Sequence, residues 1–136
     1  MITAVDTSVL LDVFKRHVQF GPSSALALKK SLADGAVIAC DVVWAEVTAA
    51  FPDVASATAA LETLGIAFVP LSQSDARRAG EAWRDYRSAG GSRDRATADF
   101  LIAAHAIGRA DQLLTRDRGF YRRYFAGLQV LDPSSG

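Results

Sequence analysis

The chain has a single cysteine, Cys40, among its 136 residues, so no internal disulfide can stabilise the fold. A chain of this length buries enough apolar surface to fold without cross-links, and a lone thiol is compatible with a reducing compartment. No stretch approaches the roughly 18 consecutive apolar residues of a membrane span, and the N-terminus lacks the basic region of a signal peptide. Half of the residues are hydrophobic, which argues against disorder. We therefore expect one cytoplasmic domain over residues 1–136, without membrane association.

The chain also lacks net charge, because 15 Lys and Arg balance 15 Asp and Glu. Neutrality at first argues against nucleic-acid binding, since contacts to phosphates usually need a basic surface. The two halves differ, however. Residues 1–66 carry four basic residues against seven acids, whereas residues 67–136 carry eleven Arg and no Lys against eight acids. Arg binds phosphate in a bidentate manner, which favours RNA binding by the second half, but genomic base composition explains an excess of Arg over Lys equally well.

Short apolar runs bounded by Gly, Pro or Asp alternate with longer segments of helical periodicity. The runs predict strands at Ile2–Val5, Val37–Cys40, Ile66–Leu71, Gln112–Thr115 and Leu128–Leu131. Helices are predicted at Pro22–Ala33 before Gly35, at Val42–Ala50 with Asp41 as a candidate cap, at Val54–Leu64 between Asp53 and Gly65, from a Ser72/Asp75 capping box to about Ser88, and at Thr97–Ile107. The predicted order is βααβααβααβαβ. This alternation favours an α/β fold, in which a parallel sheet of about five strands is covered by helices on both faces.

Four acidic residues occupy positions that suit a functional site in such a fold. Asp6 and Asp117 follow predicted strands, and ligands of open α/β sheets bind beyond the carboxyl ends of the strands. A carboxylate after a strand is also a common helix cap, so each of the two has a structural alternative. Glu46 and Asp99 share helix rows with Val, Ile and Ala residues and are predicted to face the apolar interior. An ionised acid there requires a cation or an ion pair with a distant Arg.

If the four acids converge, they form a site with oxygen ligands only, which suits Mg2+ or Mn2+ rather than zinc. His17 and His105 are better explained as a surface and a helix-packing histidine than as zinc ligands. A hard cation at a carboxylate cluster indicates phosphoryl chemistry, and the chain has no GxxxxGK, GxGxxG or GxSxG motif that would indicate another reaction. The hydroxyls beside the strand-end acids either orient carboxylates and metal-bound water or cap helices; they belong to Thr7, Ser8 and Thr115.

Four sequence blocks, in this order, resemble PIN domains and specifically the VapC toxins. They are AVDTS from Ala4 to Ser8, WAEV from Trp44 to Val47, ADFLIAAHA from Ala98 to Ala106, and LTRD from Leu114 to Asp117. The resemblance covers nearly the whole chain. It implies an endoribonuclease toxin of a toxin–antitoxin system, dependent on Mg2+ or Mn2+ held by the four acids. It further implies a homodimer and a cognate antitoxin that blocks the acidic site.

The chain departs from many relatives at Gly119, where they have a further acid two residues after the last aspartate. We expect activity with fewer protein ligands and more coordinated water. Arginines flank the predicted site and are candidates for RNA phosphate contacts, with surface ion pairs as the alternative; they are Arg93, Arg95, Arg116 and Arg118. Core packing is preferred over base stacking for six aromatic residues, with a dimer contact as an alternative for Trp83; they are Trp44, Trp83, Phe120, Tyr121, Tyr124 and Phe125.

Two other functions are compatible with an acidic pocket on a small α/β domain. A phospho-acceptor signalling domain also binds Mg2+, but it needs a second acid beside Asp6 and a Lys after a late strand. Thr7 follows Asp6, and no Lys lies beyond Lys30. A non-catalytic PIN scaffold, which binds metal or a partner without turnover, is the other alternative.

Overall fold

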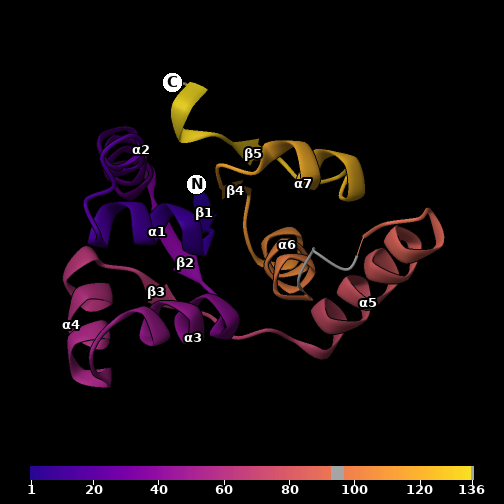
Figure 1. The fold of residues 1–136 in the computed structure, drawn as a ribbon, viewed down its shortest axis with the longest axis horizontal. Coiled ribbons are helices and arrows are strands. Elements are labelled where there is room, and N and C mark those ends of the chain that lie inside the picture. The colour runs from indigo at the N-terminus through magenta and orange to yellow at the C-terminus, as the bar shows by residue number, and fades with distance from the viewer. Residues whose placement is uncertain (93–96, 136) are drawn as a thin grey trace.

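A five-stranded parallel sheet forms the centre of the computed structural model, which describes residues 1–92 and 97–135 (Figure 1). Its strand order is β3-β2-β1-β4-β5, and every neighbouring pair is parallel. The strands are β1 (Ile2–Val5), β2 (Ala36–Ala39), β3 (Ala67–Phe68), β4 (Gln112–Leu114) and β5 (Val130–Leu131). The last three residues of β1 and of β2 are buried, as expected for central strands of a sheet covered on both faces.

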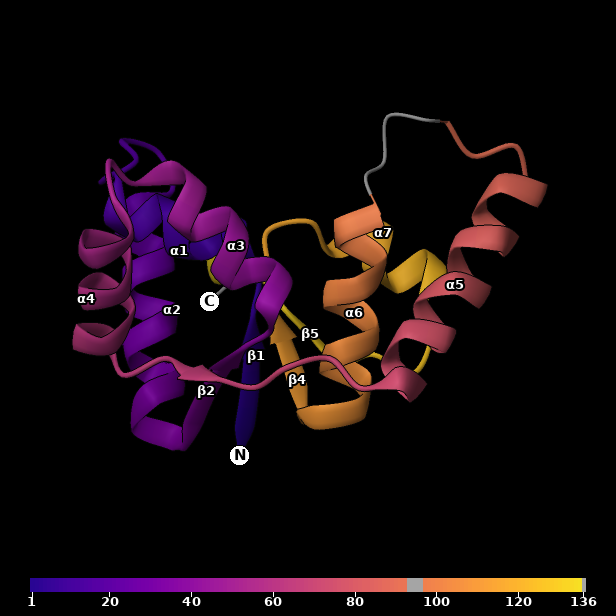
Figure 2. The same cartoon turned by 90° about the horizontal axis from the view of Figure 1, so that it is seen from below.

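Seven helices connect these strands in the described chain, and the order βααβααβααβαβ is confirmed. They are α1 (Thr7–Phe14), α2 (Gly21–Asp34), α3 (Asp41–Ala50), α4 (Val54–Leu64), α5 (Gln73–Ser88), α6 (Thr97–Arg109) and α7 (Arg118–Tyr124), followed by a short 3-10 turn at Pro133–Ser135. Figure 2 shows α1 to α4 on one side of the strands and α5 to α7 on the other. The predicted α/β fold with helices on both faces of the sheet is therefore confirmed.

Local capping explains where several helices begin and end. Ser72 and Asp75 form the predicted capping box at the start of α5, and Asp53 accepts a hydrogen bond from the Ser56 N–H at the start of α4. Gly65 ends α4 in the left-handed conformation, at φ 79°. The prediction that Asp41 caps α3 was wrong. The helix begins at Asp41 itself, and the carboxylate accepts a hydrogen bond from Leu71 N–H instead.

Aromatic side chains fill the space between the sheet and helices α5 to α7. Phe100 of α6 lies 5.2 Å from Phe120 and 5.4 Å from Tyr86, both edge to face. Tyr121 and Phe125 are also buried, so core packing is confirmed for this group. Trp83 is half-buried beside Phe100.

The two histidines lie where the sequence predicted them. His105 is buried on α6, where its Nε2 is 2.8 Å from the Val69 carbonyl oxygen, and His17 is exposed. In the part of the chain that the structure describes, no helix is long and apolar enough to cross a membrane.

The topology fixes one place where chemistry is expected. From β1 the chain moves to β2 and β3 on one side of the sheet, and from β4 it moves to β5 on the other, so the switch point lies between β1 and β4. These strands are neighbours, with Val5 opposite Leu114. Ligands of open α/β sheets bind at the carboxyl ends of the strands that flank this point.

Candidate functional site

Asp6 and Asp117 lie at the carboxyl ends of the two strands that flank the switch point. Asp6 directly follows β1, and its N–H donates to the Leu114 carbonyl at 2.9 Å. Asp117 follows β4 after Thr115 and Arg116. Both aspartates occupy the N-cap positions of helices, α1 and α7 respectively, yet neither side chain makes a capping hydrogen bond. Helix capping therefore does not account for either carboxylate.

Two hydroxyl groups orient the Asp6 carboxylate. Thr115 Oγ1 donates to Oδ2 of Asp6 at 2.7 Å, and the Tyr121 hydroxyl donates to the same oxygen at 3.3 Å. The Thr115 hydroxyl also accepts a hydrogen bond from the Asp117 N–H at 3.1 Å, so it connects the two strand-end acids. Asp6 is 7% exposed, and no basic side chain in the described part of the chain forms an ion pair with it. The site thus holds a buried acid among hydroxyls.

Burial raises the pKa of Asp6 from 3.8 to about 6, because the charged form loses hydration. The hydrogen bond from Thr115 acts in the opposite direction, and the negative charge of Asp99 raises the pKa further. Asp99 lies in the first turn of α6 and is half-buried. The two acids are therefore close enough in space to affect each other's ionisation, although 93 residues separate them in the sequence.

The pKa of Tyr121 is affected by three of the four predicted acids. Its pKa is raised, first by burial and then by the charges of Asp6, Asp99 and Asp117. The charges of these three acids therefore all act on one phenol, and Asp6 also accepts its hydrogen bond. Tyr121 was predicted to pack in the core, and its contact with Asp6 was not predicted. The available signal was its position four residues after Asp117, which on a helix places it one turn further along.

Glu46 reaches the site through Thr7. Thr7 Oγ1 donates to Oε1 of Glu46 at 2.7 Å, and Thr7 directly follows Asp6. The prediction that Glu46 faces an apolar interior was wrong, because Glu46 is exposed to solvent. The buried face of α3 is centred on Val43 and Val47, and Glu46 lies at the flank of this face.

The predicted hydroxyl residues differ in their contacts. Thr7 and Thr115 both donate to predicted site acids, as described above. Ser8 Oγ is buried and makes no hydrogen bond to any described residue, the predicted site acids included.

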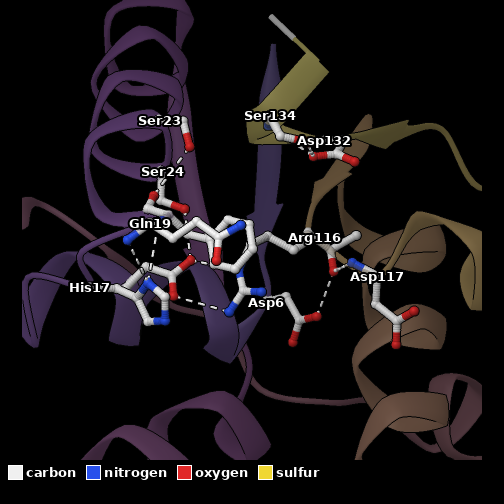
Figure 3. A network of polar contacts seen from close by, with 12 residues as sticks. Asp6, His17, Gln19, Ser23, Ser24, Arg116, Asp117, Asp132 and Ser134 are labelled. Carbon is white, nitrogen blue, oxygen red and sulfur yellow. Dashed lines mark hydrogen bonds and ion pairs between the residues drawn. The ribbon is translucent and has the colours of Figure 1, made fainter.

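The arginines predicted to contact RNA phosphates also differ in their contacts. Arg116 forms a bidentate ion pair with the buried Asp12, at 2.7 Å and 3.0 Å, which is the structural alternative to an RNA contact. Arg118 is half exposed and lies 3.5 Å from Asp132. Arg93 and Arg95 fall outside the described residues. Figure 3 shows Arg116 and Asp117 extending in opposite directions from the loop after β4, with Asp6 between them.

The donor set at this edge contains only oxygen, which suits Mg2+ or Mn2+. Among residues 1–92 and 97–135, however, no three His, Cys, Asp or Glu side chains converge into a group that could hold a metal ion. Mg2+ usually keeps several waters and binds proteins through one or two carboxylates. The neighbouring charges of Asp6 and Asp99 fit a hydrated cation, and the set of four acidic ligands stays a prediction.

The family model described as "PIN domain" matches residues 3–126 of the chain. Among solved structures, the chain is similar over 97% of its length to a chain of VapBC2 from Rickettsia felis bound to a promoter DNA fragment, with 19% identity, 98% of that chain covered and a TM-score of 0.76. A chain of VapBC-1 from nontypeable Haemophilus influenzae gives 18% identity, coverage of 98% and 99%, and a TM-score of 0.75. A chain of FitAcB from Neisseria gonorrhoeae gives 22% identity, coverage of 98% of this chain and 99% of that chain, and a TM-score of 0.67. At these identities the similarity establishes the fold. No curated protein matches the chain.

Proposed function

Because the chain belongs to the PIN-domain family, we propose that it is the toxin of a VapBC-type pair and that it hydrolyses RNA with the help of a divalent cation. The observation that carries this proposal is the pair of strand-end carboxylates at the switch point. Asp6 and Asp117 stand at N-cap positions without capping, and Asp6 is buried with a raised pKa. A fold that keeps a buried carboxylate among hydroxyls, without a basic partner in the described chain, is suited to receive a cation.

In this proposal, the carboxylates of Asp6, Asp99, Asp117 and Glu46 would hold Mg2+ or Mn2+ together with coordinated water. When bound, the cation makes water more acidic and offsets negative charge on the phosphate under attack. Thr115 and Tyr121 hold the Asp6 carboxylate in one orientation through their hydrogen bonds to Oδ2. Thr7 holds Glu46 in the same way. The ordering of these acids before RNA arrives reduces the reorganisation that catalysis requires.

RNA is the proposed substrate, and the solvent-exposed part of Arg118 is a candidate for a phosphate contact near the site. Arg93 and Arg95 remain candidates from the sequence alone. Arg116 does not belong to this group, because its guanidinium is bound to Asp12.

We propose two protein partners, of which only the antitoxin rests on analogy with structures of this fold that are described as toxin–antitoxin complexes or systems. One is a second copy of the chain, forming a homodimer. The other is a cognate antitoxin that inserts a basic side chain among the acids, since a cation there offsets the same negative charge as the metal. Binding of this antitoxin should weaken with added salt and compete with Mg2+.

The decisive experiment is an RNA cleavage assay with the purified chain in Mg2+, Mn2+, Zn2+ and EDTA. We expect cleavage with Mg2+ or Mn2+, none in EDTA, and no restoration by Zn2+. Asp6→Asn and Asp99→Asn should be inactive, whereas Asp85→Asn, which removes an exposed acid of α5, should cleave normally. Undiminished cleavage in EDTA or by either site variant would refute the metal mechanism.

The absence of a closed group of three acids among the described residues favours a second candidate, a PIN scaffold that binds a cation or partner without turnover. The same assay separates the two functions. A chain that binds Mn2+ but leaves structured and single-stranded RNA intact would be a scaffold.

A further inference from the structure

Arg116 is held by an ion pair whose geometry is well defined. Its Nε donates to Oδ2 of Asp12 at 2.7 Å, and its Nη2 donates to Oδ1 at 3.0 Å. Ser24 Oγ of α2 donates to Oδ2 of the same carboxylate at 2.9 Å. The Asp12 side chain is only 3% exposed, so loss of Arg116 would leave a buried charge with one hydroxyl donor. Figure 3 shows Arg116 reaching toward Ser24 and the segment around His17.

A second contact fixes the plane of the guanidinium. The Arg116 Cζ atom lies 4.1 Å from the centroid of the Phe20 ring, which is a cation–π arrangement. Phe20 in turn lies beside His17, with ring centroids 5.1 Å apart. The side chain of Arg116 is therefore restrained both at its donor edge and at its face, although 30% of it remains exposed. The bidentate contact to Asp12 requires the planar fork of a guanidinium, which Lys cannot reproduce.

The position of the pair in the chain connects it to the proposed site. Arg116 lies between Thr115, which donates to Asp6, and Asp117. Asp12 lies on α1, which begins directly after Asp6. The loop after β4 is thus attached to the Asp6–α1 segment at two points, through Thr115 to Asp6 and through Arg116 to Asp12. Because the loop after β4 is attached at two points, it can neither rotate freely nor move away from the Asp6–α1 segment.

Asp117 stands at the N-cap position of α7. Its side chain does not cap α7, and its backbone lies at φ −99° and ψ 52°, outside the helical region. Arg116 directly precedes Asp117, so its pair with Asp12 restrains the backbone that leads into Asp117.

We infer that Arg116 is a positioning residue, whose pair with Asp12 fixes the loop 115–117 so that Asp117 faces Asp6 across the cation site. The inference rests on the proposed function, because it assigns Asp117 to that site. It replaces an RNA-phosphate role for Arg116 with a role in metal affinity. Loss of residues that orient metal-binding groups typically weakens metal affinity or activity by about 10- to 100-fold.

The test measures the binding of Mn2+ to the purified chain without RNA, either by titration calorimetry or from the EPR signal of free Mn2+. The variants are Arg116→Lys and Asp12→Asn, each measured well below its melting temperature. Arg109→Lys is the matched control, because Arg109 also pairs with a buried acid, Asp75, at 3.4 Å and with similar exposure, but away from the site. We expect both site-side variants to bind Mn2+ at least about tenfold more weakly and the control to bind normally. The double variant should lose little more than either single variant, because the two residues act as a pair.

RNA cleavage supplies the second readout. A positioning role predicts a lower kcat in Arg116→Lys at subsaturating Mg2+, with an unchanged KM for RNA and partial rescue by excess Mg2+. A raised KM with normal Mn2+ affinity would show an RNA contact and overturn the inference. An equal loss of Mn2+ affinity in Arg109→Lys would show a general effect on folding and also overturn it. If the wild type binds Mn2+ but cleaves no RNA, and the variants still bind it weakly, the proposed function fails while the positioning role stands.

Discussion

The buried Asp6 carboxylate should make the metal-free protein less stable as the pH rises. Its folded-state pKa is about 6, against 3.8 as its ordinary value. Between these values the folded state holds a proton that the unfolded state has released, so the free energy of unfolding falls as the pH rises through this range. A difference of about 2 pKa units corresponds to roughly 3 kcal/mol by pH 7, and relaxation around the charge makes this an upper bound.

Asp6→Asn removes this dependence, because the amide is neutral at every pH and its oxygen can still accept from Thr115 and Tyr121. At pH 7 in EDTA we expect the variant to be more stable than the wild type by about 1 to 3 kcal/mol. For a domain of this size each kcal/mol raises the melting temperature by about 3 to 4 °C. At pH 4 the two proteins should melt together.

The assay is a set of thermal melts at pH 4, 5, 6 and 7, in EDTA and in Mg2+, with Asp85→Asn as a control for the loss of a carboxylate. Mg2+ at about ten times its dissociation constant should stabilise the wild type by roughly 1.4 kcal/mol and Asp6→Asn much less. If Asp6→Asn is less stable than the wild type at pH 7 in EDTA, Asp6 is a structural residue rather than a cation ligand. An equal response of both proteins to Mg2+ would also contradict the site.

Three further predictions concern other positions. Gly119→Asp restores an acid where space is open around the Cβ position, and it should tighten Mn2+ binding measured by calorimetry; unchanged or weaker binding would show that position 119 lies away from the cation. Gly108→Ala should cost about 1 to 3 kcal/mol in denaturant unfolding, because its Cβ would clash with the buried Asp75 carboxylate, whereas Gly119→Ala should be neutral or stabilising. His105 has a pKa lowered mainly by burial, so its contribution to stability is present above pH 6.5 and is lost as the pH falls; unfolding of His105→Gln should depend less on pH between 7 and 5.

The order of the elements follows from the sequence because buried parallel strands and amphipathic helices have different periods. The ends of the strands do not follow as well. The strand predicted at Ile66–Leu71 is observed only at Ala67–Phe68. Val69 N–H still donates to the Ala39 carbonyl, but Pro70 has no N–H with which to continue the ladder. At the other edge, Leu128 is held in a turn by its N–H bond to Phe125, which delays β5 until Val130.

The positions of Asp6 and Asp117 could be predicted, because the carboxyl ends of adjacent parallel strands share one edge of the sheet. The exposure of Glu46 could not, because its apolar neighbours in the helix row do not reveal which side of α3 packs against α1 and α6. The role of Arg116 was equally hidden. Its partner Asp12 is 104 residues away in the sequence, and nothing in the local pattern distinguishes an arginine bound to a buried acid from one available to RNA.

The hydroxyl groups around Asp6 leave its negative charge without a cation within the site, so the proposed metal and the proposed antitoxin would both gain by supplying one. Thr115 and Tyr121 stabilise the carboxylate by hydrogen bonds but supply no charge, so burial leaves its pKa raised. Had an Arg taken the place of Tyr121, the ionised acid would be satisfied within the chain and a cation would gain little by binding. Ionisation of the buried Asp6 carboxylate destabilises the metal-free fold, so any positive group that binds beside it gains free energy by relieving this cost. A metal ion and a basic side chain of a partner would compete for the same gain, so inhibition by an antitoxin would require no separate regulatory surface at the site.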